Sequence, residues 1–229
     1  MLNKRQSQIL ETLRRQKRMS VSAISKRFYI CEMTVRRDLK VLEDEGCIQR
    51  YRGGAIAPEE GELAPVKLRK YLHAKQKAAL AEKTKPYLHD HMNVFIDSSS
   101  TCLYLIPLLA EYKQIHVITN SVMSLLAAAE RNLPCTLVGG DYFKRDMCTV
   151  GSIAEEFLRP LNVDAAFFSS EGLSDDGLIT DSDEQQSAVR RIVMANSPVN
   201  VLLLDSHKCR KKYLYTLCRT EDVTEMILL

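Results

Sequence analysis

The chain has 229 residues, of which 45% are hydrophobic and 27% are charged, and its net charge is +3. No run of about 18 apolar residues occurs and the amino terminus is charged, so a membrane-spanning or secreted protein is excluded and a cytoplasmic one is predicted. The seven cysteines are odd in number and lack paired metal-ligand spacing, which indicates buried or idle thiols in a reducing compartment.

Positive charge is concentrated near the N-terminus. Residues 1–53 contain 13 Lys and Arg against 6 Asp and Glu, a net charge of +7, which leaves −4 for the remaining residues. This asymmetry predicts a segment that attracts a polyanion, joined to an acidic body. A merely solvated helix face is the alternative for any single arginine, but the agreement of charge with helix, turn and wing spacing favours DNA binding.

Three short helices are predicted in this segment, over residues 4–16, 21–28 and 32–45. Each has apolar residues at helical spacing on one side, namely Ile9, Leu10 and Leu13, then Ile24 and Phe28, then Val35, Leu39 and Leu42. Ser20 is placed to cap the second helix and Gly46 to end the third. The pattern is typical of a helix-turn-helix.

The third helix and the segment after it carry the expected DNA contacts. Residues 47–56 alternate apolar and polar side chains around Gly53 and Gly54, which predicts a two-stranded wing. The expected DNA-contacting residues are Glu32, Met33, Thr34, Arg36 and Arg37 on the helix and Arg50 and Arg52 on the wing. Asp38 is expected to be structural and to pair with an arginine of its own or a neighbouring helix.

The remaining chain is long enough for a second domain. Residues 57–75 contain Pro58, Pro65 and three glutamates without a sustained apolar period, so they predict a connector that leads into a helix. We therefore expect a winged helix-turn-helix over 1–56, a linker over 57–75 and a second domain over 76–229.

The second domain alternates predicted helices with short apolar strands. The helices are expected at 76–88, 101–109, 121–131, 153–158 and 183–196, and the strands at 93–96, 115–118, 135–138, 165–168 and 199–204. This alternation predicts an α/β fold with a mainly parallel sheet that is covered on both faces. Pro107 conflicts with its predicted helix and is expected to kink or shorten it.

Small polar residues follow each predicted strand. They are Asp97, Ser98, Ser99, Ser100 and Thr101, then Thr119, Asn120 and Ser121, then Gly139 and Gly140, then Glu171, and finally Asp205, Ser206, His207 and Lys208. A lone serine-rich loop is more often a helix cap than a binding site. Ligands bind parallel sheets at the carboxyl ends of their strands, so the repetition predicts an effector site there, with the first loop able to hold a phosphate.

Two motifs in the first 56 residues resemble the DNA-binding domain of the DeoR family of bacterial transcription regulators. Glu32-Met33-Thr34-Val35-Arg36-Arg37-Asp38-Leu39 is similar to its recognition-helix signature, and Arg50-Tyr51-Arg52-Gly53-Gly54-Ala55 to its wing. Cys31 departs from the family, which usually has a serine cap there. This replacement is expected to cost about 1 kcal/mol of helix stability without abolishing binding.

Residues 76–229 resemble the DeoR effector domain, which is similar in fold to ribose-5-phosphate isomerase and senses phosphorylated sugars. Positions that match its pattern are those of the strand-end loops together with Gly151, Glu184, Val189, Arg190 and Arg191. The resemblance adds Glu184 to the expected effector residues. Ser99 stands in place of the usual Gly, Ser169 and Ser170 in place of Gly-Ala, and Glu171 in place of Asp. A side chain in place of hydrogen narrows the approach of a phosphate to the backbone.

Two other classes of function compete with a regulator. An isomerase could use Asp97 or Glu171 as a general base. However, a shared fold does not imply a shared reaction, and the attached DNA-binding domain favours ligand sensing over catalysis. A metal site could use His89, Asp90 and His91 with His73 or His116, but no recognised ligand spacing supports it. We therefore predict no catalytic residue, no metal and no cofactor.

The sequence predicts a ligand-responsive regulator, most simply a repressor of a sugar-metabolism operon. Its expected partners are a double-stranded DNA operator, a phosphorylated sugar effector and further copies of the same chain. One recognition helix contacts few base pairs, so useful sequence specificity requires a homo-oligomer that binds repeated half-sites.

Overall fold

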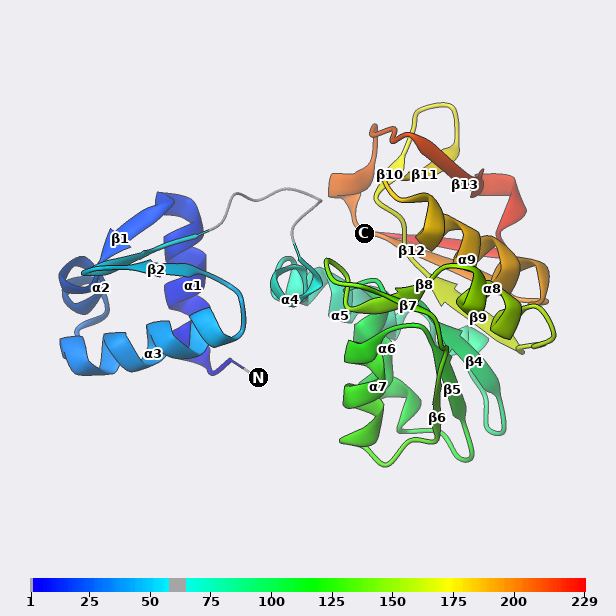
Figure 1. Ribbon diagram of the computed structural model, residues 1–229, viewed down its shortest axis with the longest axis horizontal. Coiled ribbons are helices and arrows are strands. Elements are labelled where there is room, and N and C mark those ends of the chain that lie inside the picture. The colour runs from blue at the N-terminus through cyan, green and yellow to red at the C-terminus, as the bar shows by residue number, and fades with distance from the viewer. Residues whose placement is uncertain (1, 58–64) are drawn as a thin grey trace. The chain divides into compact units, whose positions relative to one another are not determined.

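The computed structural model describes residues 2–57 and 65–229. They fall into two compact units, residues 1–72 (the N-terminal unit) and residues 73–229 (the C-terminal unit) (Figure 1). Part of the predicted connector, residues 58–64, lies outside the described residues. Within the described ranges, no helix is both long and apolar enough to cross a membrane.

The N-terminal unit contains the three predicted helices, α1 (Lys4–Gln16), α2 (Val21–Phe28) and α3 (Glu32–Asp44). Their boundaries follow from local caps. The Ser20 hydroxyl accepts a hydrogen bond of 3.1 Å from the Ala23 amide at the start of α2, as predicted. Gly46, with φ of +70°, follows the end of α3 in the left-handed conformation that glycine adopts without strain.

The wing has one more strand than predicted. Strands β2 (Gln49–Tyr51) and β3 (Gly54–Ile56) form the expected hairpin, but β1 (Arg18–Ser20) pairs with the other side of β3, giving the order β1-β3-β2. Three residues between two helices are too short to show an alternating pattern, so β1 gave no signal in the sequence. Gly54 is required in β3, because a Cβ there would lie 2.4 Å from the Met19 carbonyl oxygen.

A short helix from the predicted connector belongs to the N-terminal unit. Helix α4 (Val66–Arg69) contributes Leu68, which is 1% exposed and lies in one cluster with the core residues of α1, α2 and α3. Beyond it, Lys70 Nζ and the Tyr71 hydroxyl each lie 2.9 Å from Glu45 Oε2, at the end of α3. The chain therefore adds a fourth helical element to the three-helix core.

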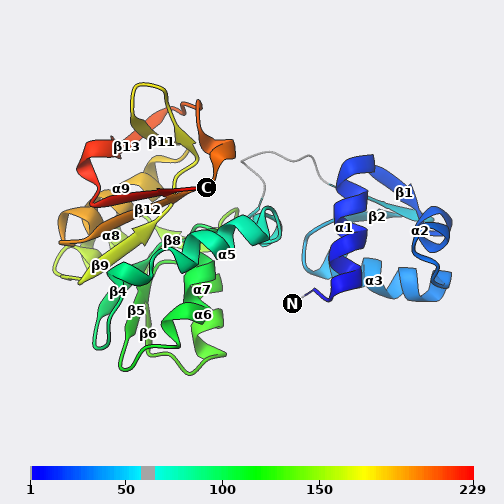
Figure 2. The ribbon, with the colours of Figure 1, turned by 180° about the vertical axis from the view of Figure 1, so that it is seen from behind.

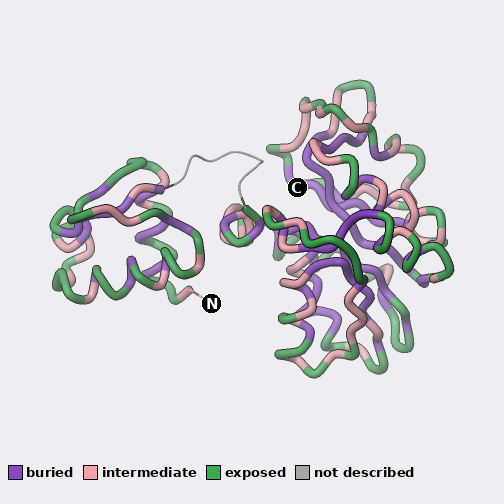
Figure 3. Tube along the Cα trace, viewed as in Figure 1, coloured by how far each residue is buried: buried purple, intermediate pink, exposed green. Residues whose placement is uncertain are grey.

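The C-terminal unit is built on a six-stranded parallel sheet in the order β14-β12-β9-β4-β5-β6. Its strands are β4 (Asn93–Ile96), β5 (His116–Thr119), β6 (Cys135–Leu137), β9 (Ala165–Phe168), β12 (Asn200–Leu204) and β14 (Glu225–Leu228). The prediction of an α/β fold with a mainly parallel sheet is confirmed. The central strands β12 and β9 are buried along their whole length, whereas the edge strand β6 is half-buried (Figure 3).

Alternate residues of each strand face two different cores. Val94 and Ile96 of β4 pack with α5 (Ala74–Glu82), α6 (Leu105–Leu109) and α7 (Val122–Ala129). Phe95, between them, packs with α8 (Ser152–Leu158) and α9 (Glu184–Ala195). Figures 1 and 2 show these two helical layers on opposite faces of the sheet. Because the side-chain period of a strand is two, a continuous apolar strand serves both layers.

Two predicted helices are shorter than expected. The helix predicted over 76–88 ends at Glu82 and is followed by a 3₁₀ turn, η1 (Lys85–Tyr87). The helix predicted over 101–109 is a 3₁₀ turn, η2 (Cys102–Tyr104), followed by the five residues of α6. Pro107 is the third residue of α6, where a backbone N–H would have no partner within the helix, so α6 begins where the proline is tolerated.

Two small antiparallel elements were not predicted. Strands β7 (Asp141–Phe143) and β8 (Cys148–Val150) form a hairpin, and β10 (Gly172–Leu173), β11 (Leu178–Asp181) and β13 (Tyr215–Arg219) form a second sheet. These strands have two to five residues and no continuous apolar run, so periodicity does not distinguish them from loops. Between β12 and β13 lies a further 3₁₀ turn, η3 (Ser206–Lys208), and η4 (Thr220–Asp222) follows β13.

Candidate DNA interface and candidate effector site

Helix α3 has one buried side and one exposed side. Val35, Leu39 and Leu42 are fully buried in the core of the N-terminal unit. The opposite side presents the predicted DNA-contacting residues of the helix, of which Thr34 is half-buried and Glu32, Met33, Arg36 and Arg37 are exposed. Met33 is 72% exposed, although methionine is usually buried. An apolar side chain can contact thymine methyl groups, while the polar residues beside it can contact the polar base edges.

Asp38 fixes α3 against α1. Its carboxylate accepts hydrogen bonds from Arg5 Nε at 2.7 Å, from Arg5 Nη2 at 3.1 Å and from Gln6 Nε2 at 3.1 Å, and its side chain is 3% exposed. The predicted structural role and arginine partner of Asp38 are present. This contact sets the orientation in which α3 is presented.

The amino end of α3 lacks a strong cap. Cys31 occupies the N-cap position without a side-chain hydrogen bond to the helix backbone, and its Sγ lies 3.1 Å from Thr34 Oγ1. That hydrogen bond lowers the pKa of the exposed Cys31 thiol below its ordinary value. One of the predicted base-reading residues, Thr34, is thus oriented by the residue that replaces the usual serine cap.

The cationic wing follows α3 in the sequence and forms an ion pair with it. Arg50 Nη1 is 3.6 Å from Glu43 Oε2, and on the helix Arg36 Nη2 is 3.3 Å from Glu32 Oε2. Arg52 is exposed at the turn between β2 and β3. Exposed ion pairs contribute roughly 0–1 kcal/mol, so both paired arginines can exchange their carboxylates for DNA phosphates at little cost.

One exposed aromatic residue of this unit was not predicted as a contact. Tyr29, in the turn between α2 and α3, has φ of +53° and is 95% exposed. Its hydroxyl and its ring are both available to a partner. Only the structure reveals this exposure, because a single tyrosine in a turn carries no periodic signal.

Apart from Glu184, the predicted effector residues lie at the ends of β4, β5, β6, β9 and β12 or in the loops that follow these strands. We call these loops the strand-end cluster; they comprise residues 97–101, 119–121, 139–141, 169–172 and 205–208. Residues of the first two loops and Ser169, Ser170 and Glu171 are buried, whereas Gly139, Gly140 and Lys208 are not. The parallel sheet brings the loops together at one edge, as the position of strand ends predicts.

Asp97 anchors the cluster to α9. Its Oδ2 accepts hydrogen bonds from Arg190 Nε at 3.0 Å and from the Ser169 amide at 3.2 Å, and its Oδ1 accepts one from the Ser99 amide at 2.9 Å. The same guanidinium donates to Asp181 Oδ2 at 2.7 Å. Burial alone would lower the pKa of Arg190, but the carboxylates of Asp181 and Asp97 raise it above its ordinary value, so the residue stays charged.

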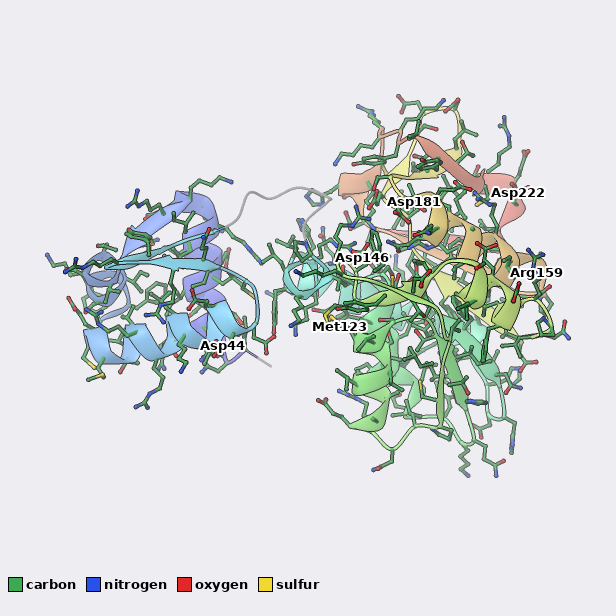
Figure 4. The ribbon with its side chains drawn as sticks, in the orientation of Figure 1. Asp44, Met123, Asp146, Arg159, Asp181 and Asp222 are labelled. Atoms are coloured by element: carbon green, nitrogen blue, oxygen red, sulfur yellow. The ribbon has the colours of Figure 1, made fainter. Side chains whose placement is uncertain are left out.

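A second set of contacts links α9, the β7–β8 turn and the loop after β9. Gln186 accepts a hydrogen bond of 3.0 Å from Ser98 Oγ and donates one of 2.5 Å to Asp146. Arg145 lies 3.0 Å from Asp146 and 3.2 Å from Glu171. Figure 4 labels Asp146 and Asp181, the two acids that the unpredicted strands bring to this network.

Two lysines donate to serines of the cluster. Lys77 Nζ of α5 lies 2.9 Å from Ser100 Oγ, and Lys208 Nζ lies 2.8 Å from Ser169 Oγ. Lys208 was predicted as an effector residue, but Lys77 was not. The Thr101 hydroxyl and the side-chain oxygen Oδ1 of Asn120 are buried, and neither has a hydrogen-bond partner in the described part of the chain.

Other predicted residues serve the fold as well. Thr119 Oγ1 donates to the Ile96 carbonyl at 2.6 Å, Asn120 Nδ2 donates to the Thr149 carbonyl at 3.0 Å, and Ser121 caps α7. Gly140 has φ of +135°, and a Cβ there would lie 2.6 Å from the Val150 carbonyl oxygen. These residues of the strand-end cluster therefore also stabilise the local fold.

Glu184 is placed apart from the other predicted residues. Its carboxylate is 49% exposed and pairs with Arg191 of the same helix. In residues 65–229, it is Gln186 and Arg190 of α9 that contact the strand-end loops. They are four residues apart and therefore lie on the same side of α9, which is the buried one. The sequence shows this spacing but not the loop residues that the two side chains contact.

The serines that depart from the family pattern are accommodated. Ser99 is not among the residues with positive φ, and its Oγ accepts a hydrogen bond of 3.1 Å from the Cys102 amide. Ser170 Oγ lies 2.7 Å from the Thr180 carbonyl oxygen. Both hydroxyls therefore satisfy backbone groups of this chain, so a ligand that uses them must share them.

Metal ligation has no geometric support. Among the described residues, no group of three or more His, Cys, Asp or Glu side chains could hold a metal ion. His89 Nδ1 lies 2.8 Å from the Asp90 carbonyl oxygen, and His116 Nε2 lies 2.9 Å from Thr136 Oγ1. All seven cysteines are free thiols.

Two sequence models match the chain. The DeoR-like helix-turn-helix domain matches residues 5–61, and the DeoR C terminal sensor domain matches residues 72–228. Among curated proteins, the L-fucose operon activator of Haemophilus influenzae is 29% identical over 218 residues, covering 94% of this chain and 87% of the relative. The glycerol-3-phosphate regulon repressor of Escherichia coli is 24% identical over 205 residues, covering 89% and 81%.

Solved structures are similar in fold. The delta subunit of eIF2B from Chaetomium thermophilum aligns with a TM-score of 0.51 and 11% identity, over 70% of this chain and 60% of that one. Ribose 5-phosphate isomerase A from Methanocaldococcus jannaschii aligns with a TM-score of 0.45 and 18% identity, over 60% of this chain and 56% of the isomerase. The alignments thus span less than two thirds of these structures. The sequence relatives are named as regulators, which favours regulation over isomerase chemistry.

Proposed function

Because the chain belongs to the DeoR family of DNA-binding transcription regulators, we propose that it represses a sugar-metabolism operon and releases its operator when a phosphorylated sugar or related metabolite binds. In this proposal residues 1–56 read DNA, residues 57–75 link the two halves, and residues 76–229 sense the effector and hold the oligomer together. The cytoplasm, where operator and metabolite meet, is its proposed location.

The observation that carries the DNA half is the exposed side of α3 within a cationic unit. Glu32, Met33 and Thr34 at its amino end are the proposed base readers, and Arg36 and Arg37 the proposed phosphate or guanine contacts. Arg50 and Arg52 of the wing are proposed to bind the DNA backbone or minor groove. Residues 1–53 carry a net charge of +7, which supports strong, salt-dependent attraction to DNA.

The effector half rests on the strand-end cluster and on the relatives. Two of them are named for L-fucose and glycerol 3-phosphate metabolism, so a sugar or its phosphate is the proposed class of effector. The proposed effector residues lie mostly in the loops of this cluster, and they are Asp97, Ser98, Ser99, Ser100, Thr101, Thr119, Asn120, Ser121, Gly139, Gly140, Glu171, Glu184 and Lys208. Lysine ammonium and serine hydroxyl groups are suited to a phosphate.

A homo-oligomer is proposed because one recognition helix contacts few base pairs. Two copies held by their C-terminal units would place two readers on repeated half-sites. An effector that binds one arrangement of the subunits more tightly than the other would shift the equilibrium away from the spacing that fits the operator.

Operator binding tests the proposal. Fluorescence anisotropy with DNA fragments from the gene's own upstream region should show nanomolar to micromolar binding, weakened by glycerol 3-phosphate, ribose 5-phosphate or a related sugar phosphate. Sedimentation of the free chain should show a dimer or a higher oligomer. A chain that binds none of these fragments at low salt would contradict the DNA half, and an affinity unchanged by every sugar phosphate would contradict the effector half.

A further inference from the structure

Tyr29 lies in the turn between α2 and α3, and its side chain does not contribute to the fold of the N-terminal unit. It is 95% exposed. Across residues 2–57 and 65–229, no hydrogen bond, ion pair or ring contact involves this side chain. A tyrosine that is fully exposed offers both an apolar ring and a hydroxyl donor to a partner outside the unit.

The backbone of Tyr29, in contrast, has a clear structural role at the end of α2. Its φ of 53° and ψ of 42° are left-handed, and its amide donates to the Ser25 carbonyl. Ser25 Oγ donates to the Ile30 carbonyl at 2.6 Å, which fixes the turn further. Glycine adopts this conformation without strain, whereas a residue with a Cβ is strained in it. The turn therefore uses only the backbone of residue 29, and the side chain adds strain.

The surroundings of Tyr29 favour DNA as the partner. The turn leads directly into the amino end of α3 (Figure 1). Within residues 2–57 and 65–72, the large hydrophobic side chains that are exposed are those of Tyr29 and Met33. Four exposed cations flank them in the sequence, namely Lys26, Arg27, Arg36 and Arg37. A cationic surface repels a second copy of itself and attracts a polyanion, so its charge favours DNA over another subunit.

The distance along the chain places Tyr29 within reach of the DNA backbone. The four residues from Tyr29 to Met33 span at most about 14 Å when fully extended. The major groove, which admits a recognition helix, is about 12 Å wide. When the amino end of α3 lies in this groove, a side chain at this distance from Met33 meets the phosphates that border it. Tyrosine hydroxyls are among the groups that donate to phosphate oxygens.

We propose that the Tyr29 hydroxyl donates a hydrogen bond to a backbone phosphate beside the groove that α3 enters, and that this contact fixes the position of Met33 and Thr34 on the base edges. The inference deepens the DNA half of the proposed function. Tyrosine is neutral, so the contact adds affinity without neutralising a phosphate charge. In this it differs from the phosphate contact proposed for Arg36.

Fluorescence anisotropy on the full chain tests the contact, with a random-sequence duplex at low salt and with any upstream fragment that wild type binds. Y29F, which removes only the hydroxyl, should weaken binding to both about threefold to tenfold. The slope of affinity against salt should stay unchanged. The matched control is Y142F, which removes a hydroxyl from a 59% exposed tyrosine of the C-terminal unit and should bind like wild type.

The Y29G substitution separates the contact from the fold. It removes the left-handed strain together with the side chain, so the melting temperature of the N-terminal unit should stay the same or rise by a few degrees. DNA binding should nevertheless weaken at least as much as in Y29F. A lower melting temperature would overturn the claim that the side chain does not contribute to the fold. Dissociation of an oligomer in Y29G but not in Y142F would place Tyr29 in a subunit contact and overturn the assignment to DNA.

Methylphosphonate substitution identifies the phosphate. In an upstream fragment that wild type binds, replacement of one phosphate by methylphosphonate should weaken binding of wild type more than binding of Y29F. If no position of the fragment behaves in this way, the assignment is wrong.

The outcomes separate the inference from the function beneath it. If Y29F binds both duplexes as tightly as wild type does, the Tyr29 assignment is wrong and the proposed DNA binding stands. If wild type binds the random duplex but no upstream fragment, the operon proposal fails and the random duplex still decides the role of Tyr29. If wild type binds no duplex, both are overturned. A shallower salt dependence in Y29F would contradict a neutral contact.

Discussion

The N-terminal unit exposes Arg36 at its surface, whereas the C-terminal unit buries Arg190 between two carboxylates. Arg36 on α3 is 53% exposed and its only ion pair within the described residues is with the equally exposed Glu32. Arg190 on α9 is 8% exposed and contacts Asp97 and Asp181, which are 1% and 3% exposed. The same side chain is thus available to a partner in one unit and holds the fold together in the other. Substitutions should therefore separate binding from stability.

The largest effect is expected at Arg190. The R190M substitution leaves Asp97 and Asp181 buried without their cation, which should lower the free energy of unfolding by about 3–5 kcal/mol. Urea unfolding followed by far-UV circular dichroism measures this change. The control is R191M at the next position of α9, where the arginine side chain is 38% exposed and pairs with Glu184, and it should cost less than about 1 kcal/mol. Equal effects of the two substitutions would contradict a central role for the buried pair.

The next largest effect on stability is expected at Asp38. The D38N substitution weakens the hydrogen bonds to Arg5 and Gln6 that join α1 to α3, at a cost of about 1–3 kcal/mol. Thermal unfolding of the full chain should show a destabilised N-terminal unit. D44N changes an exposed aspartate of the same helix and serves as the control. If D44N destabilises the chain as much as D38N does, the contact between α1 and α3 is not what matters.

Removal of Arg36 should affect DNA and leave the fold unchanged. The R36A substitution is expected to weaken operator binding about tenfold and to make the salt dependence of binding shallower by about one unit of slope, if the side chain meets a phosphate. Anisotropy titrations at several salt concentrations measure both quantities. R159A is matched to it, because Arg159 also forms an exposed ion pair with a glutamate four residues earlier. An unchanged slope together with lost affinity would indicate base contact instead.

The smallest expected effect is a gain of stability at the start of α3. In C31S a hydroxyl replaces a thiol that makes no hydrogen bond to the helix backbone, which should stabilise the N-terminal unit by up to about 1 kcal/mol. Thermal unfolding gives the change, and C218S, at a cysteine of the C-terminal unit, shows whether thiol removal alone has an effect. A loss of stability in C31S would mean that the contact between Cys31 and Thr34 outweighs a standard cap.

The sequence predicts the N-terminal unit well because its information is local. Apolar spacing, Ser20 and Gly46 act within a few residues of each other, so the helix boundaries follow directly. The third strand of the wing escaped prediction because its pairing is with residues about 36 positions away, beyond the reach of any local pattern.

The C-terminal unit shows where such inference ends. The strand-end loops could be located because parallel strands all end at one edge of the sheet. Their partners could not, since Asp97 meets Arg190 across 93 residues and Ser98 meets Gln186 across 88. A helical pattern shows which side of α9 is buried but not which acid its arginine faces. The contact of Lys77 with Ser100 was not predicted for a similar reason, because a single lysine in a helix with other charged residues is typical of a solvent-exposed position.

Helix α4 bears on how the DNA-binding half should be cut from the chain. Leu68 completes the apolar interior of the N-terminal unit, and Lys70 and Tyr71 hold the acidic end of α3. A truncation after residue 56 would remove α4 and expose apolar side chains of the N-terminal unit to water, whereas a truncation after residue 72 would keep α4. The shorter fragment should unfold at a lower temperature and aggregate more readily, even though it contains every side chain proposed to contact DNA.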